Sequence, residues 1–202
     1  MRPFSYHHGT LIDRLVAART AAPMLERMCA DPRRDVFFDR SDWVSVYADA
    51  ANTVRRDQGR LTATRAITLQ GRMIWLVRAR AFKRAYHSRA GTAEAAFRDA
   101  ETAWSRRAAM RVHRDELQRV VRDLRFGRVR YPITVDDAYA SPLCEEGVDG
   151  FLRSFGLGRF RTFPGWFIAW AFALDRQVGF VIWEAHLRQA GPAHGEEAAR
   201  GS

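Results

Sequence analysis

The stretch from Phe163 to Trp183 constrains the fold more than any other part of the chain. It reads FPGWFIAWAFALDRQVGFVIW and has 21 residues, which is long enough for a helix that crosses a bilayer. Aromatic residues lie at both of its ends and arginines flank it, as in a helix anchored at both membrane interfaces. We therefore interpret residues 161–188 as one long aromatic-rich helix, with residues 163–183 as a candidate single transmembrane span.

Two charges in the middle of this stretch, Asp175 and Arg176, oppose insertion into lipid. Together they cost roughly 6 kcal/mol at a helix centre, whereas the Phe, Ile, Leu and Val residues of the stretch return roughly 4 kcal/mol. A span is then stable only if both charges face other proteins or water. The same helix could equally be buried in the core of a folded domain, and the pattern leaves both readings open.

The excess of basic residues is concentrated in the middle of the chain. The net charge is +10, with 32 Arg and one Lys, and residues 55–130 alone hold 20 basic and seven acidic residues. No acidic residue occurs between residues 58 and 93, where apolar residues alternate with basic ones. We predict a long basic amphipathic helix there. Its arginines could bind anionic lipid headgroups, RNA phosphates or an acidic subunit, or could simply face solvent.

Three further helices are predicted from the spacing of apolar residues, from a capping residue and from composition. Residues 93–125 repeat apolar side chains at helical spacing, from Phe97 through Trp104 to Leu124, and predict the clearest helix of the chain. A helix is also expected from about Trp43 to Arg56, after a capping residue. The first 34 residues are rich in Arg and Ala and are typical of either a retained mitochondrial targeting helix or an ordinary first helix.

Residues 126–160 change character, with prolines, glycines and acidic pairs that indicate an extended or looping connection. Within it Val129, Tyr131, Ile133 and Val135 alternate like one short strand. The predicted fold is mainly α, with several amphipathic helices. Its divisions are an N-terminal helical segment (1–57), a basic helical region (58–125), an irregular loop connection (126–160), the hydrophobic helix (161–188) and a polar tail (189–202).

The sequence contains none of the familiar catalytic, phosphate-binding or zinc-binding motifs. Its two cysteines, Cys29 and Cys144, lie far apart, and two buried thiols are a simpler expectation than a disulfide. We therefore expect no enzymatic activity, no cofactor, no metal and no small-molecule substrate.

The favoured hypothesis is a non-catalytic accessory subunit of a large membrane assembly, in the mitochondrial inner membrane, in a respiratory complex or ATP synthase. The alternatives are an RNA-associated organellar ribosomal subunit in the matrix, and a soluble helical interaction protein of a bacterial cytoplasm. The residues expected to contact partner subunits, lipid headgroups or RNA are Arg72, Arg78, Arg80, Arg84, Trp166, Asp175, Arg176 and Trp183.

Overall fold

The computed structural model describes residues 36–41, 43–68, 70–82 and 84–191. The chain divides into two compact units. Unit 1 comprises the described residues up to Thr102 together with Cys144–Ser154, and unit 2 comprises Ala103–Leu143 and the described residues from Phe155 onward. The helix α2 (Ala93–Ala109) begins in unit 1 and ends in unit 2.

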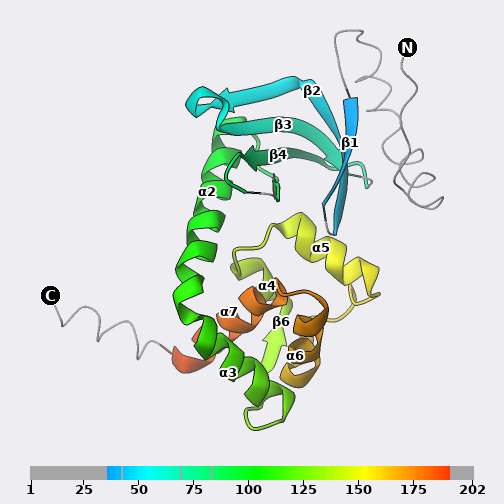
Figure 1. The fold of residues 1–202 in the computed structure, drawn as a ribbon. Helices are drawn as coiled ribbons and strands as arrows, with labels where there is room; N and C mark the ends of the chain where they lie inside the picture. Colours follow the sequence, from blue (N-terminus) through cyan, green and yellow to red (C-terminus); the bar gives the residue numbers. More distant parts are fainter. Residues whose placement is uncertain (1–35, 42, 69, 83, 192–202) are drawn as a thin grey trace, which may run out of the picture. The chain divides into compact units, whose positions relative to one another are not determined.

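Unit 1 is built on an antiparallel sheet in which each strand pairs with the next along the chain (Figure 1). A 3₁₀ turn at Asp57–Gly59 joins the second strand to the third. Ala66 lies opposite both Ala48 and Ile74, so three neighbouring strands are in register. The strands are β1 (Val36–Ser41), β2 (Val44–Arg56), β3 (Leu61–Thr68), β4 (Met73–Ala79) and β5 (Tyr86–Ser88).

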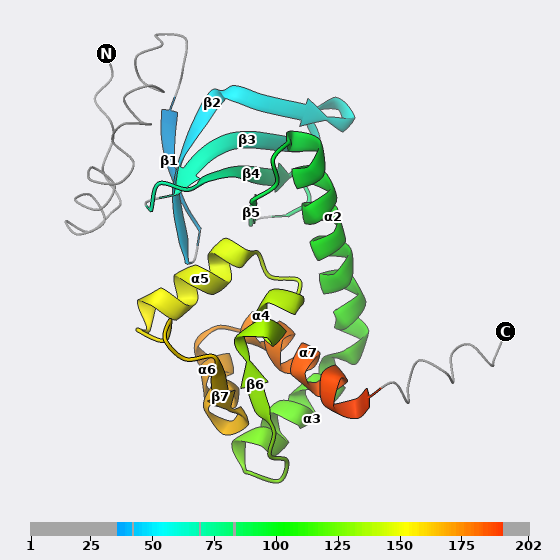
Figure 2. The ribbon, with the colours of Figure 1, turned by 180° about the vertical axis from the view of Figure 1, so that it is seen from behind.

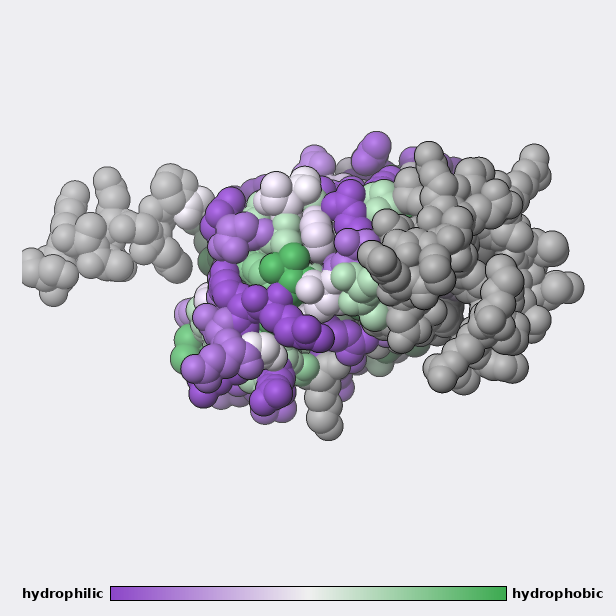
Figure 3. All heavy atoms as spheres, turned by 90° about the horizontal axis from the view of Figure 1, so that it is seen from above, coloured by the Kyte–Doolittle hydropathy of each residue, from purple (hydrophilic) through white to green (hydrophobic). Residues whose placement is uncertain are grey.

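The core of unit 1 follows from the two-residue period of its strands. Alternate residues of β2 and β4 point to the same face, where they form a buried cluster with Ala66. Hydrophilic side chains predominate around a small hydrophobic area on the coloured surface seen from the β2 side of the sheet (Figure 3). The cluster consists of Val44, Val46, Ala48, Ala66, Ile74 and Leu76.

The mainly α prediction is wrong, because residues 58–93 form strands and not a basic amphipathic helix. The sequence of β3, LTATRAIT, is rich in β-branched residues, which favour strands. Gly59 and Gly71 adopt positive φ angles of 79° and 81° and allow tight turns on either side of this strand. The helix expected over residues 43–56 is likewise β2. The fold is mixed α/β.

The helix α5 (Glu145–Ser154) packs in unit 1 although it lies far from the sheet in sequence. Its Glu146 is 3% exposed and accepts hydrogen bonds from Arg72 Nη1 (2.8 Å) and Arg89 Nε (2.7 Å). Asp149 of the same helix is paired with both arginines. Charge-assisted bonds of this kind are about twice as strong as neutral ones, so this network holds α5 against the sheet.

Unit 2 is helical apart from a two-stranded ribbon (Figure 2). The ribbon pairs β6 (Pro132–Thr134) with β7 (Thr162–Pro164), so that Ile133 lies opposite Phe163. Each strand leads directly into a helix, β6 into α4 and β7 into α6. The helices are α3 (Arg114–Arg125), α4 (Val135–Ala140), α6 (Gly165–Leu174) and α7 (Val178–Ala190).

Two sequence predictions for these residues are confirmed in part. Residues 93–125 are helical, but a 3₁₀ turn at Met110–His113 divides them into α2 and α3. The short strand expected near Ile133 is β6. The rest of the predicted loop connection, residues 126–160, is wrong because it contains α4 and α5.

The single hydrophobic helix expected over residues 161–188 is also wrong. After β7 the chain forms α6, breaks at Asp175 and starts again as α7. Asp175 is extended (φ −136°, ψ 116°), and its carboxylate accepts the Gln177 N–H at 2.8 Å. The charge pair therefore belongs to a turn. In the part of the chain that the structure describes, no helix combines the length and hydropathy of a membrane span.

The break at Asp175 overturns the predicted transmembrane span, the sheet of unit 1 overturns the mainly helical fold, and nothing found supports a mitochondrial location. The hypothesis of an accessory subunit in a large assembly stays a prediction that no finding tests. The possible targeting segment, Cys29 and most of the polar tail lie outside the described residues.

Candidate functional site

A row of large apolar side chains is exposed along α6 in unit 2. Trp166, Trp170 and Leu174 follow one another at four-residue intervals and are 54%, 57% and 72% exposed. The opposite side of the helix is buried through Ile168, Ala169 and Phe172. Exposed tryptophans on one face of a helix are expensive in water and are typical of binding surfaces. We call Trp166, Trp170 and Leu174 the α6 stripe.

The second component is the basic face of α3. Val121 and Leu124 are buried, whereas Arg114, Arg119 and Arg122 are exposed. Among the described residues, no carboxylate forms an ion pair with any of these three arginines. Two carboxylates of α3 pair with other residues instead, Asp123 with Arg128 and Glu116 with His113 and His186. Their positive charge is therefore open to an outside anion.

Arg125 joins these two surfaces. The helical period places it on the side of α3 shared by Arg114 and Arg122, next to the buried face. Its guanidinium carbon lies 4.5 Å from the Trp170 ring centroid, and its Nη2 donates to the Ala169 carbonyl at 3.4 Å. A guanidinium stacked on indole is a favourable cation–π arrangement. The arginines of α3 thus continue into the aromatic stripe of α6.

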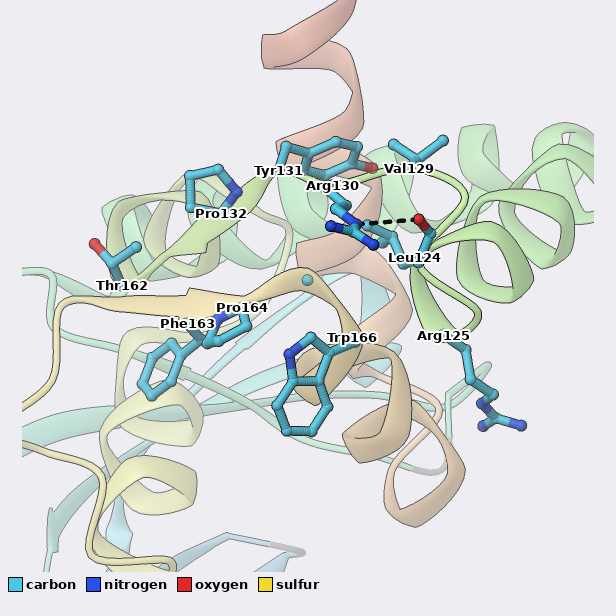
Figure 4. Close-up of a pocket in the computed structure, with 12 residues that line it drawn as sticks. Leu124, Arg125, Val129, Arg130, Tyr131, Pro132, Thr162, Phe163, Pro164 and Trp166 are labelled. Atoms are coloured by element: carbon cyan, nitrogen blue, oxygen red, sulfur yellow. Dashed lines mark hydrogen bonds between the residues drawn. The ribbon is translucent and has the colours of Figure 1, made fainter.

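An open pocket of about 700 Å³ lies beside the first turn of α6 (Figure 4). Its apolar lining comes from both strands of the ribbon and from the helices, and its cationic lining from Arg125 and Arg130. Figure 4 shows Arg130 reaching toward the space between Tyr131 and Trp166, whereas Arg125 points away. The apolar lining includes Leu124, Tyr131, Pro132, Phe163, Pro164 and Trp166.

Local backbone geometry builds this pocket. Gly127 ends α3 with a φ of 68°, a conformation that glycine adopts without strain. Its carbonyl accepts a hydrogen bond from Arg130 Nε at 3.3 Å, which orients the arginine. Gly165 admits the close approach of the α6 backbone, because a Cβ there would lie 2.8 Å from the Tyr131 carbonyl oxygen.

Tyr131 contributes an apolar wall and not a charge. Burial raises the pKa of its phenol to about 12, so the hydroxyl is neutral at physiological pH. The hydroxyl is buried and finds no hydrogen-bond partner among the described residues. Tyr131 therefore adds no negative charge to the pocket, into which the guanidinium of Arg130 reaches.

A cysteine–histidine pair in unit 1 was not expected from the sequence, because the two residues are 57 positions apart. Cys144 Sγ lies 3.5 Å from His87 Nδ1. Burial lowers the pKa of His87 to about 4, against the opposing influence of Asp39 and Glu146. A base of this strength holds few protons at neutral pH and is poorly suited to a thiolate–imidazolium nucleophile. We interpret the pair as structural.

The buried His87 should make unit 1 sensitive to acid. Its pKa is about 4 when folded and 6.5 ordinarily, so the unfolded chain binds a proton between these values that the folded chain does not. Stability should therefore fall as pH decreases from about 6.5 to 4, by about 3 kcal/mol in total. Urea unfolding at several pH values should show this loss, and His87→Gln should remove most of it. A pH dependence unchanged in the variant would contradict this assignment.

The residues predicted to contact partners lie in different surroundings. Trp166 belongs to the α6 stripe, whereas Trp183 is buried with its ring stacked on His113 at 4.9 Å. Arg72 and Arg78 form ion pairs inside unit 1, with Glu146 and Asp39. Exposed Arg80 and Arg84 lie in the connection between β4 and β5. Asp175 and Arg176 form the turn after α6, where Arg176 stacks on Phe172 at 4.7 Å.

The sequence reasoning missed Trp170, Arg125 and Arg130. Trp170 could have been found from its four-residue spacing to Trp166 if α6 had been taken as a short helix with one exposed face. Within the described residues, no group of His, Cys, Asp or Glu could hold a metal ion. No family model, curated protein or solved structure matches this chain.

Proposed function

We propose that unit 2 is a binding module for single-stranded nucleic acid, in which the basic face of α3 and the α6 stripe act together. This develops the RNA-associated alternative drawn from the sequence. The observation that carries it is the stacking of Arg125 on Trp170, since this contact makes one continuous surface from unpaired positive charge and exposed indole rings.

The charge of this surface selects an anionic partner. Arg114, Arg119 and Arg122 have no carboxylate partner among the described residues. Neutralising phosphates with such side chains releases condensed counterions and supplies most of the affinity of non-specific nucleic-acid binding. The exposed arginines on α3 therefore fit a phosphate backbone.

The indole rings favour a single strand over a duplex. Bases of an unpaired strand can stack on exposed aromatic side chains, and each such contact contributes about 1–3 kcal/mol. Bases of a duplex are already stacked on one another and offer no free faces. Trp166 and Trp170 lie one helical turn apart and are both more than half exposed, so two successive bases could each meet one ring.

Truncating the two tryptophans should weaken strand binding strongly. We expect Trp166→Ala and Trp170→Ala each to raise the Kd for a labelled twelve-residue uridine strand by about tenfold, as the loss of one stacked base implies. Fluorescence anisotropy at low salt measures this directly, and binding should also quench tryptophan emission. Phe82→Ala removes an aromatic side chain of unit 1 that is 43% exposed and should leave the Kd unchanged.

A thymidine strand and a duplex of the same length complete the experiment. Similar affinity for the two single strands would indicate stacking and phosphate contacts, whereas preference for uridine would indicate contacts to the 2′-hydroxyl or steric exclusion of the thymine methyl group. Absence of strand binding at low salt would refute the proposed function. Equal Kd values for the native chain and a Trp166→Ala/Trp170→Ala double variant would refute it as well.

A further inference from the structure

We propose that the pocket beside α6 holds one unstacked base of the bound strand, with the phosphate next to that base on Arg130. This inference rests on the proposed function and assigns a specific role to the pocket. Its volume of about 700 Å³ lies within the range of sites that bind small organic ligands, so a base with its sugar can enter.

The lining of the pocket suits a flat aromatic ligand. Pro132, Pro164 and Trp166 offer apolar surfaces, and Leu124 and Phe163 add to them. Trp166 is shared between the pocket and the α6 stripe. A strand that stacks on Trp170 and Trp166 would therefore bring its next base to the edge of the pocket.

Arg130 is placed to bind the phosphate. Its Nε donates to the Gly127 carbonyl, which leaves the two Nη groups of the guanidinium for a ligand. Among the described residues, Arg130 has no carboxylate partner, whereas Arg128 of the same loop pairs with Asp123 at 3.5 Å. Arginine donors in this fork geometry match phosphate oxygens in pairs.

Adenosine monophosphate tests the pocket without the rest of a strand. In the full-length chain labelled with nitrogen-15, the indole signal of Trp166 is identified by its loss in Trp166→Phe. We expect adenosine monophosphate to shift this signal in a saturable way, and inorganic phosphate at the same concentration to shift it much less. Arg130→Ala should weaken binding of the nucleotide at least tenfold, and Arg130→Lys should restore only part of it.

Arg128→Ala is the matched control, because Arg128 lies two residues away and does not line the pocket. It should change nucleotide binding by no more than about twofold. A Trp166 signal that does not move with the nucleotide, or equal effects of Arg130→Ala and Arg128→Ala, would overturn the pocket assignment. If uridine strands still bind through both tryptophans, only this assignment fails. If no strand binds, the proposed function itself fails.

Discussion

Replacing Gly150 by alanine is expected to destabilise unit 1 by about 4 kcal/mol, because the added methyl group would clash severely with the backbone of the β1–β2 turn. A Cβ at this position would lie 2.1 Å from the Trp43 carbonyl oxygen and 3.0 Å from its carbonyl carbon. Both are backbone atoms and cannot rotate away. The helix α5 would have to move off the β1–β2 turn, which would also disturb the edge-on contact between Trp43 and Phe151, now 5.2 Å between ring centroids.

Chemical unfolding monitored by circular dichroism checks this expectation. Gly91→Ala serves as the control in the same unit, since a Cβ there meets no atom within 4 Å, and it should change stability by less than about 0.5 kcal/mol. A Gly150→Ala chain as stable as the Gly91→Ala chain would show that α5 does not pack against the β1–β2 turn as described.

The second large effect is expected at Asp137 in unit 2, where substitution by alanine should cost about 3 kcal/mol. Its carboxylate is 4% exposed and accepts bonds from the Thr134 backbone (2.7 Å), from the Thr134 hydroxyl (2.8 Å) and from Arg188 Nε (2.7 Å). Removing it breaks the capping box of α4 and leaves Arg188 without its carboxylate partner, although Arg188 Nη2 still donates to the Pro132 carbonyl at 3.1 Å. The ribbon strand β6, which leads into α4, should lose order as well.

The same carboxylate should make the stability of unit 2 depend on pH. Burial alone would raise the pKa of Asp137, but hydrogen bonds from Arg188 and Thr134 outweigh it and lower the pKa below its usual value. Its contribution to stability is therefore present above about pH 4 and is lost as pH falls through the lowered pKa. Asp136→Ala, at the exposed neighbouring position, is the control and should be nearly neutral. Equal unfolding free energies of the two variants would contradict this role.

Helical content was predictable where the chain repeats apolar residues over many turns. Residues 93–125 repeat apolar side chains at helical spacing, and they form α2 and α3. The sheet was missed because β3 and β4 mix arginine with apolar residues, which mimics an amphipathic helix when only composition is considered. The turns at Gly59 and Gly71 and the β-branched residues between them were the informative signals.

The span and the candidate site show where sequence reasoning reaches its limit. Hydropathy shows that the stretch from Phe163 to Trp183 is apolar enough to be buried. It cannot show that the helix ends at Asp175, whose carboxylate accepts a hydrogen bond from the Gln177 N–H. Trp166 and Trp183 were both predicted to contact partners from their places at the two ends of this stretch, but Trp166 is 54% exposed whereas Trp183 is buried. The stacking of Arg125 on Trp170 depends on how α3 packs against α6, and no local pattern encodes it.

The salt dependence of strand binding tests the central claim most directly. If the four arginines Arg114, Arg119, Arg122 and Arg130 each neutralise one phosphate, the logarithm of affinity should fall against the logarithm of salt with a slope of about −3. The Kd for a twelve-residue uridine strand should then rise about 50-fold between 50 and 200 mM salt, and Arg119→Ala/Arg122→Ala should flatten the slope by about one half. A Kd that stays constant across this range would contradict the account.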